Sequence, residues 1–323
     1  MASSPSLQKK TLWLWVKRIL LALGILVFIF IFLVVPFFFS WVLTHSGSRP
    51  NDREMTVTPE KFGVAFQPIK FASHDGAPLA GWWLPAEESP VIIIYCHGMF
   101  RSRLEMLERA AYFRQKGYAG LLFDFRRHGE SKGELSAAGF LERLDVLGAV
   151  KFLRDSLHVT KPIVTCAVSM GTGATMLAAA ESPEIAGLIL DSSFLSFDHL
   201  IAHHAKIWLG LPKFPLVDEI ILFTKWRTGF RSEQFDMKLA LDKIGDRPLL
   251  FIAGGKDVRM PPEISRQLYA HSTSTRKRLV VFEEATHGAA FTLDAARYEK
   301  ELIGFLTENF GAPAANAQAT TAH

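Results

Sequence analysis

Beyond residue 60 the chain alternates between short apolar runs and longer amphipathic stretches, and this alternation is the strongest constraint on its fold. The run VIIIYC at 91–96 is rich in β-branched side chains and has no charge, which is typical of a strand buried on both faces. Comparable runs occupy 118–126, 161–168, 185–194, 247–257 and 278–288, and helical patterns occupy 102–117, 137–157, 171–181 and 294–309. This order predicts an α/β fold, with a mostly parallel sheet covered by helices on both faces.

Two segments depart from this rhythm. Residues 64–73 and 79–86 predict two strands joined through a turn at Asp75-Gly76. Residues 195–244 separate two strands and are rich in Leu, Ile, Phe and Trp. Because a connection of about fifty residues is uncommon in a compact domain, we expect a cap insertion here, with a plain packing insertion as the alternative.

An uncharged apolar run at residues 19–43 precedes the alternating region. As a helix it would be roughly 37 Å long, enough to span a bilayer with some tilt or a bend near Pro36. A cleaved signal peptide and a buried core helix are the alternatives, but THSGSRP after the run is a poor cleavage site. We therefore predict a transmembrane signal anchor.

The predicted anchor separates a short N-terminal tail from a linker, a folded domain and a C-terminal tail. Residues 1–18 form a basic tail, 44–60 a polar linker, 61–310 the folded domain with its cap at 195–244, and 311–323 an Ala/Thr/Pro-rich tail expected to be disordered. Basic residues precede the run at Lys9, Lys10, Lys17 and Arg18 and follow it at Arg49, Arg53 and Lys61. The positive-inside rule then favours a cytoplasmic N-terminus, with the domain periplasmic, lumenal or extracellular.

Charge and cysteine content exclude several classes of protein. The net charge is +4, without a long basic block, so nucleic-acid binding has little support, whereas a membrane surface is a plausible neighbour. Cys96 and Cys166 both lie in apolar runs and are expected to be inert core thiols. The sequence specifies no cofactor and no oligomeric state.

A single serine, Ser169, stands in the segment TCAVSMGTGA between a buried strand and an alanine-rich helix. The small residues Ala167 and Gly171 flank it at −2 and +2, in the pattern A-x-S-x-G. A sharp strand-to-helix turn needs such neighbours and presents the serine hydroxyl above the sheet edge. We predict that Ser169 is a nucleophile.

A serine nucleophile needs a base and an acid that orients the base, and both should follow later strands in the order acid, then histidine. Asp257 comes just after the strand within the run 247–257 and before a helix, and His287 comes just after the strand within the run 278–288. Asp191 also ends a strand and is an alternative acid, whereas Asp294 is expected to cap a helix.

An acyl-transfer site also needs two backbone N–H groups that stabilise the oxyanion. The residue after the nucleophile, Met170, and Met99 in the loop CHGMFRSR are the expected donors. We expect His97 to fix this loop. The pair His203–His204 lacks further ligands at metal spacing, so we predict no metal site.

The segments CHGMF, DFRRHGES (124–131), AVSMG, GGKDVRMPP and ATHG together resemble the α/β-hydrolase superfamily over about residues 60–310. The resemblance is greatest to its serine-aminopeptidase-like branch, which includes membrane-anchored lysophospholipases, monoglyceride-lipase-like enzymes and protein depalmitoylases. It implies an eight-stranded, mostly parallel sheet with a small helical cap between strands six and seven. The family usually has glycine where this chain has Arg127, in a structural segment, so His128 stays outside the predicted site.

These features predict a membrane-anchored serine hydrolase that cleaves carboxylic or thio esters through an acyl-enzyme. The apolar insert and the anchor favour lipid-like substrates, such as a lysophospholipid, a monoacylglycerol or an acyl thioester. The alternatives are a membrane-bound aminopeptidase or amidase, an acyltransferase, and a catalytically silent interaction protein on the same fold.

Overall fold

The computed structural model describes residues 5–314, which fold around one eight-stranded sheet. The strands are β1 (Gln67–Ala72), β2 (Pro78–Leu84), β3 (Ile92–Cys96), β4 (Ala119–Phe123), β5 (Ile163–Val168), β6 (Ile185–Asp191), β7 (Leu249–Gly254) and β8 (Lys277–Phe282). Their order across the sheet is β1-β2-β4-β3-β5-β6-β7-β8. Strand β2 is antiparallel to both neighbours, and the other neighbouring pairs are parallel. The predicted eight-stranded, mostly parallel sheet is confirmed.

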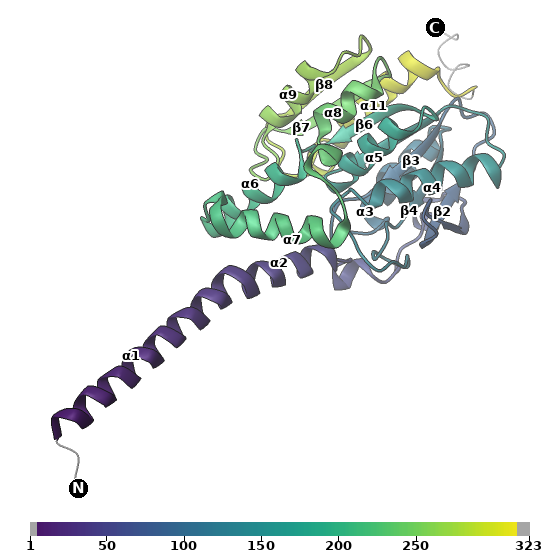
Figure 1. The fold of residues 1–323 in the computed structure, drawn as a ribbon. Coiled ribbons are helices and arrows are strands. Elements are labelled where there is room, and N and C mark those ends of the chain that lie inside the picture. The colour runs from purple at the N-terminus through teal and green to yellow at the C-terminus, as the bar shows by residue number, and fades with distance from the viewer. Residues whose placement is uncertain (1–4, 315–323) are drawn as a thin grey trace.

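Helices cover both faces of the sheet (Figure 1). On one face lie α3 (Leu104–Gln115), the short α10 (Ala290–Leu293) and α11 (Ala295–Phe310); on the other lie α4 (Glu142–Asp155), α5 (Met170–Glu181), α8 (Met237–Ile244) and α9 (Pro262–His271). Along β3, Ile92 and Ile94 belong to the α4–α5 side of the core, and Ile93 and Tyr95 to the α3–α11 side. Successive strand side chains point to opposite faces, which explains why this run is apolar throughout.

The cap lies between β6 and β7. It contains α6 (Phe197–Leu209), a π-helical turn (Lys213–Val217), α7 (Asp218–Thr228), a 3-10 turn (Ser232–Phe235) and α8. The buried rings of Phe197, Phe230 and Phe235 contact one another, with centroids 5.1–5.7 Å apart. Phe140, from the loop before α4, adds a ring 4.8 Å from that of Phe230. This aromatic cluster fastens the cap to the domain.

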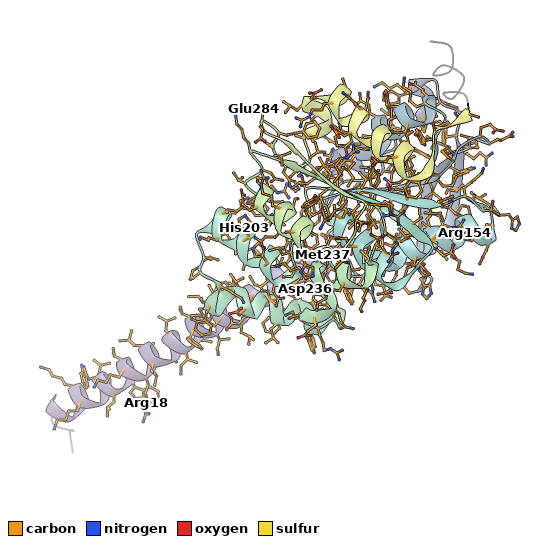
Figure 2. All side chains as sticks on the ribbon, turned by 90° about the horizontal axis from the view of Figure 1, so that it is seen from above. Arg18, Arg154, His203, Asp236, Met237 and Glu284 are labelled. Atoms are coloured by element: carbon orange, nitrogen blue, oxygen red, sulfur yellow. The ribbon has the colours of Figure 1, made fainter. Side chains whose placement is uncertain are left out.

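An almost uninterrupted helix precedes the domain, formed by α1 (Pro5–Ile29), a π-helical turn (Phe30–Val34) and α2 (Val35–Thr44). It projects away from the sheet (Figure 1), and Arg18 lies on the projecting part (Figure 2). The π-helical turn precedes Pro36, whose ring nitrogen cannot donate to the preceding turn. Residues Leu12–Thr44 are long and apolar enough to cross a bilayer.

The end of this helix packs against the cap. The ring of Phe37 meets that of Phe223 on α7 edge-on at 5.5 Å, and the Arg227 guanidinium lies 4.1 Å from the centre of the Phe37 ring. The end of the helix therefore packs directly against α7 of the cap.

The segment 44–60 is hydrogen-bonded to the domain. Ser136 N donates to Thr44 O at 2.9 Å, and Arg127 Nη2 donates to His45 O at 2.9 Å. Two 3-10 turns follow, Pro50–Asp52 and Pro59–Phe62. Of the tail at 311–323, residues 315–323 lie outside the described part of the chain, as do residues 1–4 at the other end.

The helix predicted over 137–157 begins later, at Glu142. Ala138 and Gly139 have φ values of 52° and 120°, so the backbone turns there instead of continuing a helix. The Glu142 carboxylate accepts the N–H groups of Ala137 and Gly139, at 3.1 and 2.7 Å. Apolar residues in this turn are buried like a helix face, which is why the sequence pattern extended too far.

Candidate active site

Ser169 occupies the turn between β5 and α5. Its φ is 54° and its ψ −118°, a combination that a residue with a side chain adopts only under strain. A Cβ at Gly171 would lie 2.6 Å from Cys96 O, so this position requires glycine. Ala167 is fully buried at the end of β5. The A-x-S-x-G pattern thus builds a strained turn at the carboxyl end of a parallel strand.

His287 and Asp257 lie beside this serine. His287 Nε2 is 2.9 Å from Ser169 Oγ, and His287 Nδ1 is 2.8 Å from Asp257 Oδ2. Asp257 lies after β7 and His287 after β8, so three adjacent or near-adjacent strand ends supply the three side chains. The structure brings together the three residues that the sequence predicted would meet.

Asp257 is fixed by its own loop. Its Oδ1 accepts the N–H groups of Arg259 and Met260, at 2.9 and 2.8 Å, while Oδ2 faces His287. Its side chain is fully buried. These bonds orient one carboxylate oxygen toward the imidazole.

Asp191, the alternative acid, has a different role. Its Oδ1 accepts from Ser192 Oγ at 3.1 Å, and within residues 5–314 it makes no hydrogen bond to His287. Ser192 Oγ in turn accepts the Gly288 N–H at 3.1 Å. Burial raises the pKa of Asp191 to about 6, against the opposing effect of the Arg109 guanidinium. Asp191 therefore supports the loop that carries His287.

The expected oxyanion donors flank the serine. Met99 and Ser169 line one cavity together, and Met170 begins α5 directly after the serine. In the described part of the chain neither the Met99 N–H nor the Met170 N–H has a hydrogen-bond partner. Both amides are thus available to an oxygen at this position.

His97 holds the loop that carries Met99. Its Nε2 accepts the Phe125 N–H at 3.0 Å, which leaves the proton on Nδ1 for Gly98 O at 2.7 Å. Burial lowers the pKa of His97 well below its usual value, so the ring is neutral. His97 is a loop-fixing residue, in the arrangement expected from the sequence.

The sequence is similar to those of proteins from a bacterium and a yeast. The family described as "Serine aminopeptidase, S33" matches residues 87–221. The uncharacterized protein YqkD of Bacillus subtilis is 29% identical over 300 residues, which is 90% of this chain and 97% of that protein. The uncharacterized membrane protein YNL320W of Saccharomyces cerevisiae is 24% identical over 255 residues, 78% of this chain and 84% of that protein.

Among solved structures, a Pyrococcus furiosus esterase, Pf2001, has a TM-score of 0.69 and 24% identity, over 82% of this chain and 99% of the esterase chain. The chain has the α/β-hydrolase fold. The segment of this chain that matches the family includes Ser169 but ends at residue 221. The assignment of Asp257 and His287 therefore rests on their position and geometry.

Two cavities meet at Ser169. The first, of about 280 Å³, is polar and is lined by Arg49, Arg101, Glu105, Arg259 and His287, among others. The second, of about 120 Å³, is apolar and is lined by Leu43, Phe194, Leu200, Ile201 and Trp208, among others. Ser169, Met99 and Arg259 line both, so a molecule bound at this serine adjoins both the apolar and the polar cavity.

Sequence reasoning missed Leu43 and Arg49 as site residues. Leu43 ends the apolar run and Arg49 lies in the segment predicted to be a linker. No motif marks either residue, because their place at the site depends on how the helix docks on the domain.

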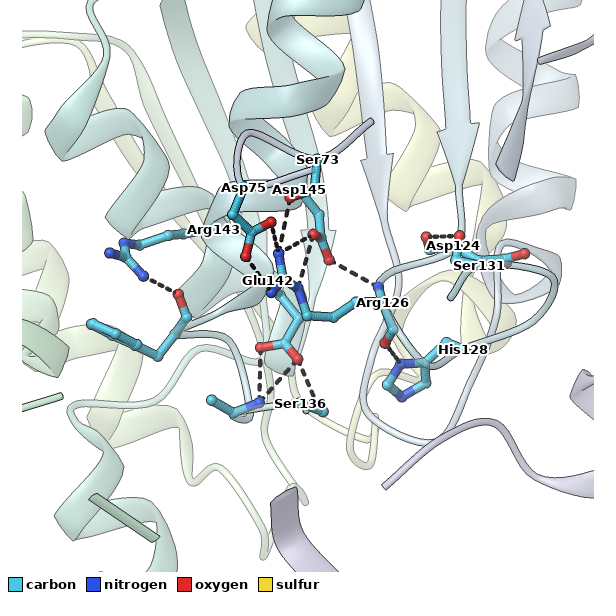
Figure 3. Close-up of polar contacts among 12 residues, drawn as sticks. Ser73, Asp75, Asp124, Arg126, His128, Ser131, Ser136, Glu142, Arg143 and Asp145 are labelled. Atoms are coloured by element: carbon cyan, nitrogen blue, oxygen red, sulfur yellow. Dashed lines mark hydrogen bonds and ion pairs between the residues drawn. The ribbon is translucent and has the colours of Figure 1, made fainter. Parts of the chain in front are cut away.

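The segment 124–131 is held by the polar contacts that Figure 3 shows around Arg126. Arg126 binds Asp145 and Asp75 through its guanidinium, at 2.7 and 2.8 Å. His128 is buried, and its Nδ1 lies 2.8 Å from Arg126 O. Arg127 has a φ of 65°, which explains why a glycine is usual there. Its side chain instead binds the segment that follows the N-terminal helix, through His45 O.

The histidines of the cap are also bound within the protein. His203 Nε2 lies 2.9 Å from Val258 O, and His204 Nδ1 lies 2.8 Å from Leu200 O. Burial lowers the pKa of His204 to about 4, so this ring is neutral beside the apolar cavity. Residues 5–314 contain no group of three His, Cys, Asp or Glu side chains placed to hold a metal ion.

Proposed function

We propose that this chain is a membrane-anchored serine hydrolase that cleaves carboxylic or thio esters. One observation carries the proposal: Ser169 Oγ, His287 and Asp257 form a continuous pair of hydrogen bonds of 2.9 and 2.8 Å. A serine hydroxyl is a weak nucleophile at neutral pH and becomes reactive beside a base that a carboxylate orients.

The reaction follows from these positions. Ser169 Oγ attacks the acyl carbon while His287 Nε2 takes its proton, and the Met99 and Met170 amides donate to the oxyanion. The bond to the leaving oxygen or sulfur breaks, and His287 returns the proton to it. Water then loses a proton to His287, attacks the acyl-enzyme and releases the acid, and Ser169 regains the proton. Asp257 stabilises the imidazolium in both steps, and one water is consumed for each ester.

The apolar cavity supports a lipid-like acyl group as the substrate. It lies directly beside Ser169, and its wall includes Leu43 from the end of the helix that can span a bilayer. An acyl chain that leaves a bilayer along this helix reaches the serine without crossing water.

The cap surface supports the same conclusion. Large apolar side chains are exposed on α6, α7 and the turn between them: Ile207, Trp208, Leu209, Phe214, Leu222 and Trp226. A soluble surface rarely exposes so many together. They adjoin α2, which packs on α7. We infer that this part of the cap rests on the bilayer that the helix enters.

The proposed topology follows from the two ends of the helix. Trp15 and Trp41 are 26 residues apart (41 − 15), roughly 39 Å at 1.5 Å per residue, close to the thickness of a bilayer with its headgroup regions. Four basic residues precede the apolar run and three follow it closely. We therefore propose a cytoplasmic N-terminus and a domain on the periplasmic, lumenal or extracellular side.

A membrane-bound aminopeptidase is the second candidate, because the matching family is described by that activity. It would have to bind a substrate ammonium with a free carboxylate. Glu105 lines the polar cavity, but it already accepts the Gly98 N–H at 2.6 Å and pairs with Arg101 at 3.2 Å. The cavity therefore favours an ester over a peptide.

The test uses the full chain in detergent and p-nitrophenyl esters from acetate to palmitate, with Ser169→Ala as the control. We expect turnover only in the unmutated chain, with an optimum at long acyl chains. An optimum at acetate would contradict the lipid-like substrate. Cleavage of aminoacyl p-nitroanilides alone would favour the aminopeptidase, and transfer to an added alcohol instead of water would favour an acyltransferase. A folded but inactive chain would favour an interaction protein.

A further inference from the structure

We propose that the polar cavity beside Ser169 binds a phosphate group on the alcohol part of the substrate, through Arg49 and Arg259. This inference rests on the proposed ester hydrolysis and narrows the substrate to an anionic lysophospholipid.

The charges around the cavity are not balanced. Three arginines line it, and Glu105 is its carboxylate apart from the buried catalytic group behind it. Arg101 forms ion pairs with Asp52 at 3.3 Å and with Glu105 at 3.2 Å. Arg49 and Arg259 have no such ion pair among the described residues.

Arg49 and Arg259 come from separate parts of the chain, one after the membrane helix and the other between β7 and α9. Among residues 5–314 neither guanidinium forms an ion pair with an acidic side chain. Arg259 Nε is buried and has no hydrogen-bond partner in the same part of the chain.

Burial lowers the pKa of Arg259; the Asp257 and Glu105 charges oppose this effect and the Arg49 charge adds to it. Arg49 is exposed, whereas Arg259 is half-buried and its guanidinium lies 5.6 Å from the centre of the Trp208 ring. Two like charges thus line one cavity without an ion pair to either of them in the described part of the chain.

The position of the cavity specifies which part of the substrate carries the anion. Ser169 lines both cavities, so an acyl chain in the apolar cavity directs the alcohol part of the ester into the polar one. Arg49 lies five positions beyond Thr44, the last residue of the helix (49 − 44). It is therefore close to the membrane surface, at the level where phospholipid headgroups lie.

Phosphate fits these two groups better than an uncharged alcohol does. Guanidinium donors bind phosphate oxygens in pairs, and a phosphate can accept from two arginines at once. A monoacylglycerol would leave the half-buried Arg259 without an anion, whereas a lysophospholipid would pair Arg259 and the exposed Arg49.

The experiment compares two uncleavable ethers that differ only in the phosphate: 1-O-hexadecylglycerol 3-phosphate and 1-O-hexadecylglycerol. Their dissociation constants are measured with the full chain in a nonionic detergent. The variants are Arg49→Gln, Arg259→Gln and Arg259→Lys. The matched control is Arg266→Gln, which removes an exposed arginine on α9 outside both cavities.

We expect the phosphate ether to bind roughly tenfold more tightly than the neutral ether, the size of effect that a charge-assisted hydrogen bond provides. Arg49→Gln and Arg259→Gln should remove most of this preference, Arg259→Lys should keep part of it, and Arg266→Gln should keep all of it. The same order should appear in kcat/KM for the corresponding cleavable esters.

Equal binding of the two ethers to the unmutated chain would overturn the proposal, and so would a preference that survives both glutamine variants. Displacement of the phosphate ether by an equal concentration of inorganic phosphate would show a site for free phosphate and would overturn the lipid headgroup as its ligand. Because binding of the ethers needs no hydrolysis, an arginine-dependent preference without any ester turnover would support this site and contradict the proposed function.

Discussion

Leu43 and Ser169 line the same apolar cavity, although one ends the membrane-spanning candidate helix and the other lies at the centre of the sheet. The helix therefore contributes a side chain to the wall of the cavity at Ser169. A chain truncated after residue 43 to remove the apolar helix would also lose this part of the cavity wall.

Leu43→Trp should fill part of the apolar cavity and shift the preferred acyl chain of an ester substrate to a shorter length. The cavity is only about 120 Å³, so one larger side chain occupies much of it. The measurement is kcat/KM over a series of p-nitrophenyl esters. Val42→Trp is the matched control, because Val42 is exposed and does not line the cavity. An unchanged optimum in Leu43→Trp would remove Leu43 from the acyl site.

Asp257→Asn should lower kcat roughly ten-thousand-fold, the size of loss known for the acid of a Ser-His-Asp triad, because the amide no longer holds the imidazole in the right tautomer. Asp191→Asn should cost far less, because Asp191 is hydrogen-bonded to Ser192, which accepts from Gly288, and within residues 5–314 makes no hydrogen bond to His287. Both variants are compared in ester turnover. A larger loss in Asp191→Asn would reverse the two assignments.

The stability of the chain should depend on Asp191 between pH 4 and 7. Burial raises the pKa of this carboxyl from 3.8 to about 6, so the folded state binds a proton that the unfolded state has released. Its contribution is then fully present below pH 3.8 and is lost as the pH rises through about 6, by up to about 3 kcal/mol. Thermal unfolding of the unmutated chain and of Asp191→Asn is measured at each pH. We expect the melting temperature of the unmutated chain to fall relative to that of the variant as the pH rises; parallel curves would contradict this account.

Gly171→Ala should destabilise the fold by about 1–3 kcal/mol, the range for overpacking a buried position. The added Cβ would lie 2.6 Å from Cys96 O and 2.9 Å from His97 O, both backbone atoms that cannot rotate away. Gly304→Ala on α11 is the control. A Cβ at Gly304 would lie 3.5 Å from its nearest neighbour, Arg278 Nη1, and alanine favours helices. Denaturant unfolding of both variants measures the difference, and equal stabilities would show that the turn at Ser169 is less tight than described.

The sheet and the three side chains at Ser169 could be predicted because each depends on local signals. Buried parallel strands are apolar runs, and their carboxyl ends meet at one edge of the sheet. Ser169, Asp257 and His287 each follow such a run, so sequence order alone specified that they would lie together. Gly171 could be predicted in the same way, because the sharp turn at Ser169 requires a small residue two positions later.

Features that depend on docking could not be predicted. The start of α4 at Glu142 depends on a carboxylate that caps two N–H groups in the preceding turn. Arg49 joins the site because residues beside it bind the domain, as in the bond from Arg127 to His45 O. Such long-range hydrogen bonds leave no periodic pattern in the sequence.

The most direct test of the account is covalent labelling of the full chain by a fluorophosphonate, measured by intact mass and by mapping of the labelled peptide. We predict one adduct, on Ser169, that is absent in Ser169→Ala and greatly slowed in His287→Gln, since His287 Nε2 lies 2.9 Å from the serine oxygen. A folded, unmutated chain that stays unlabelled, or a Ser169→Ala variant that is still labelled, would contradict the central claim that Ser169 is an activated nucleophile.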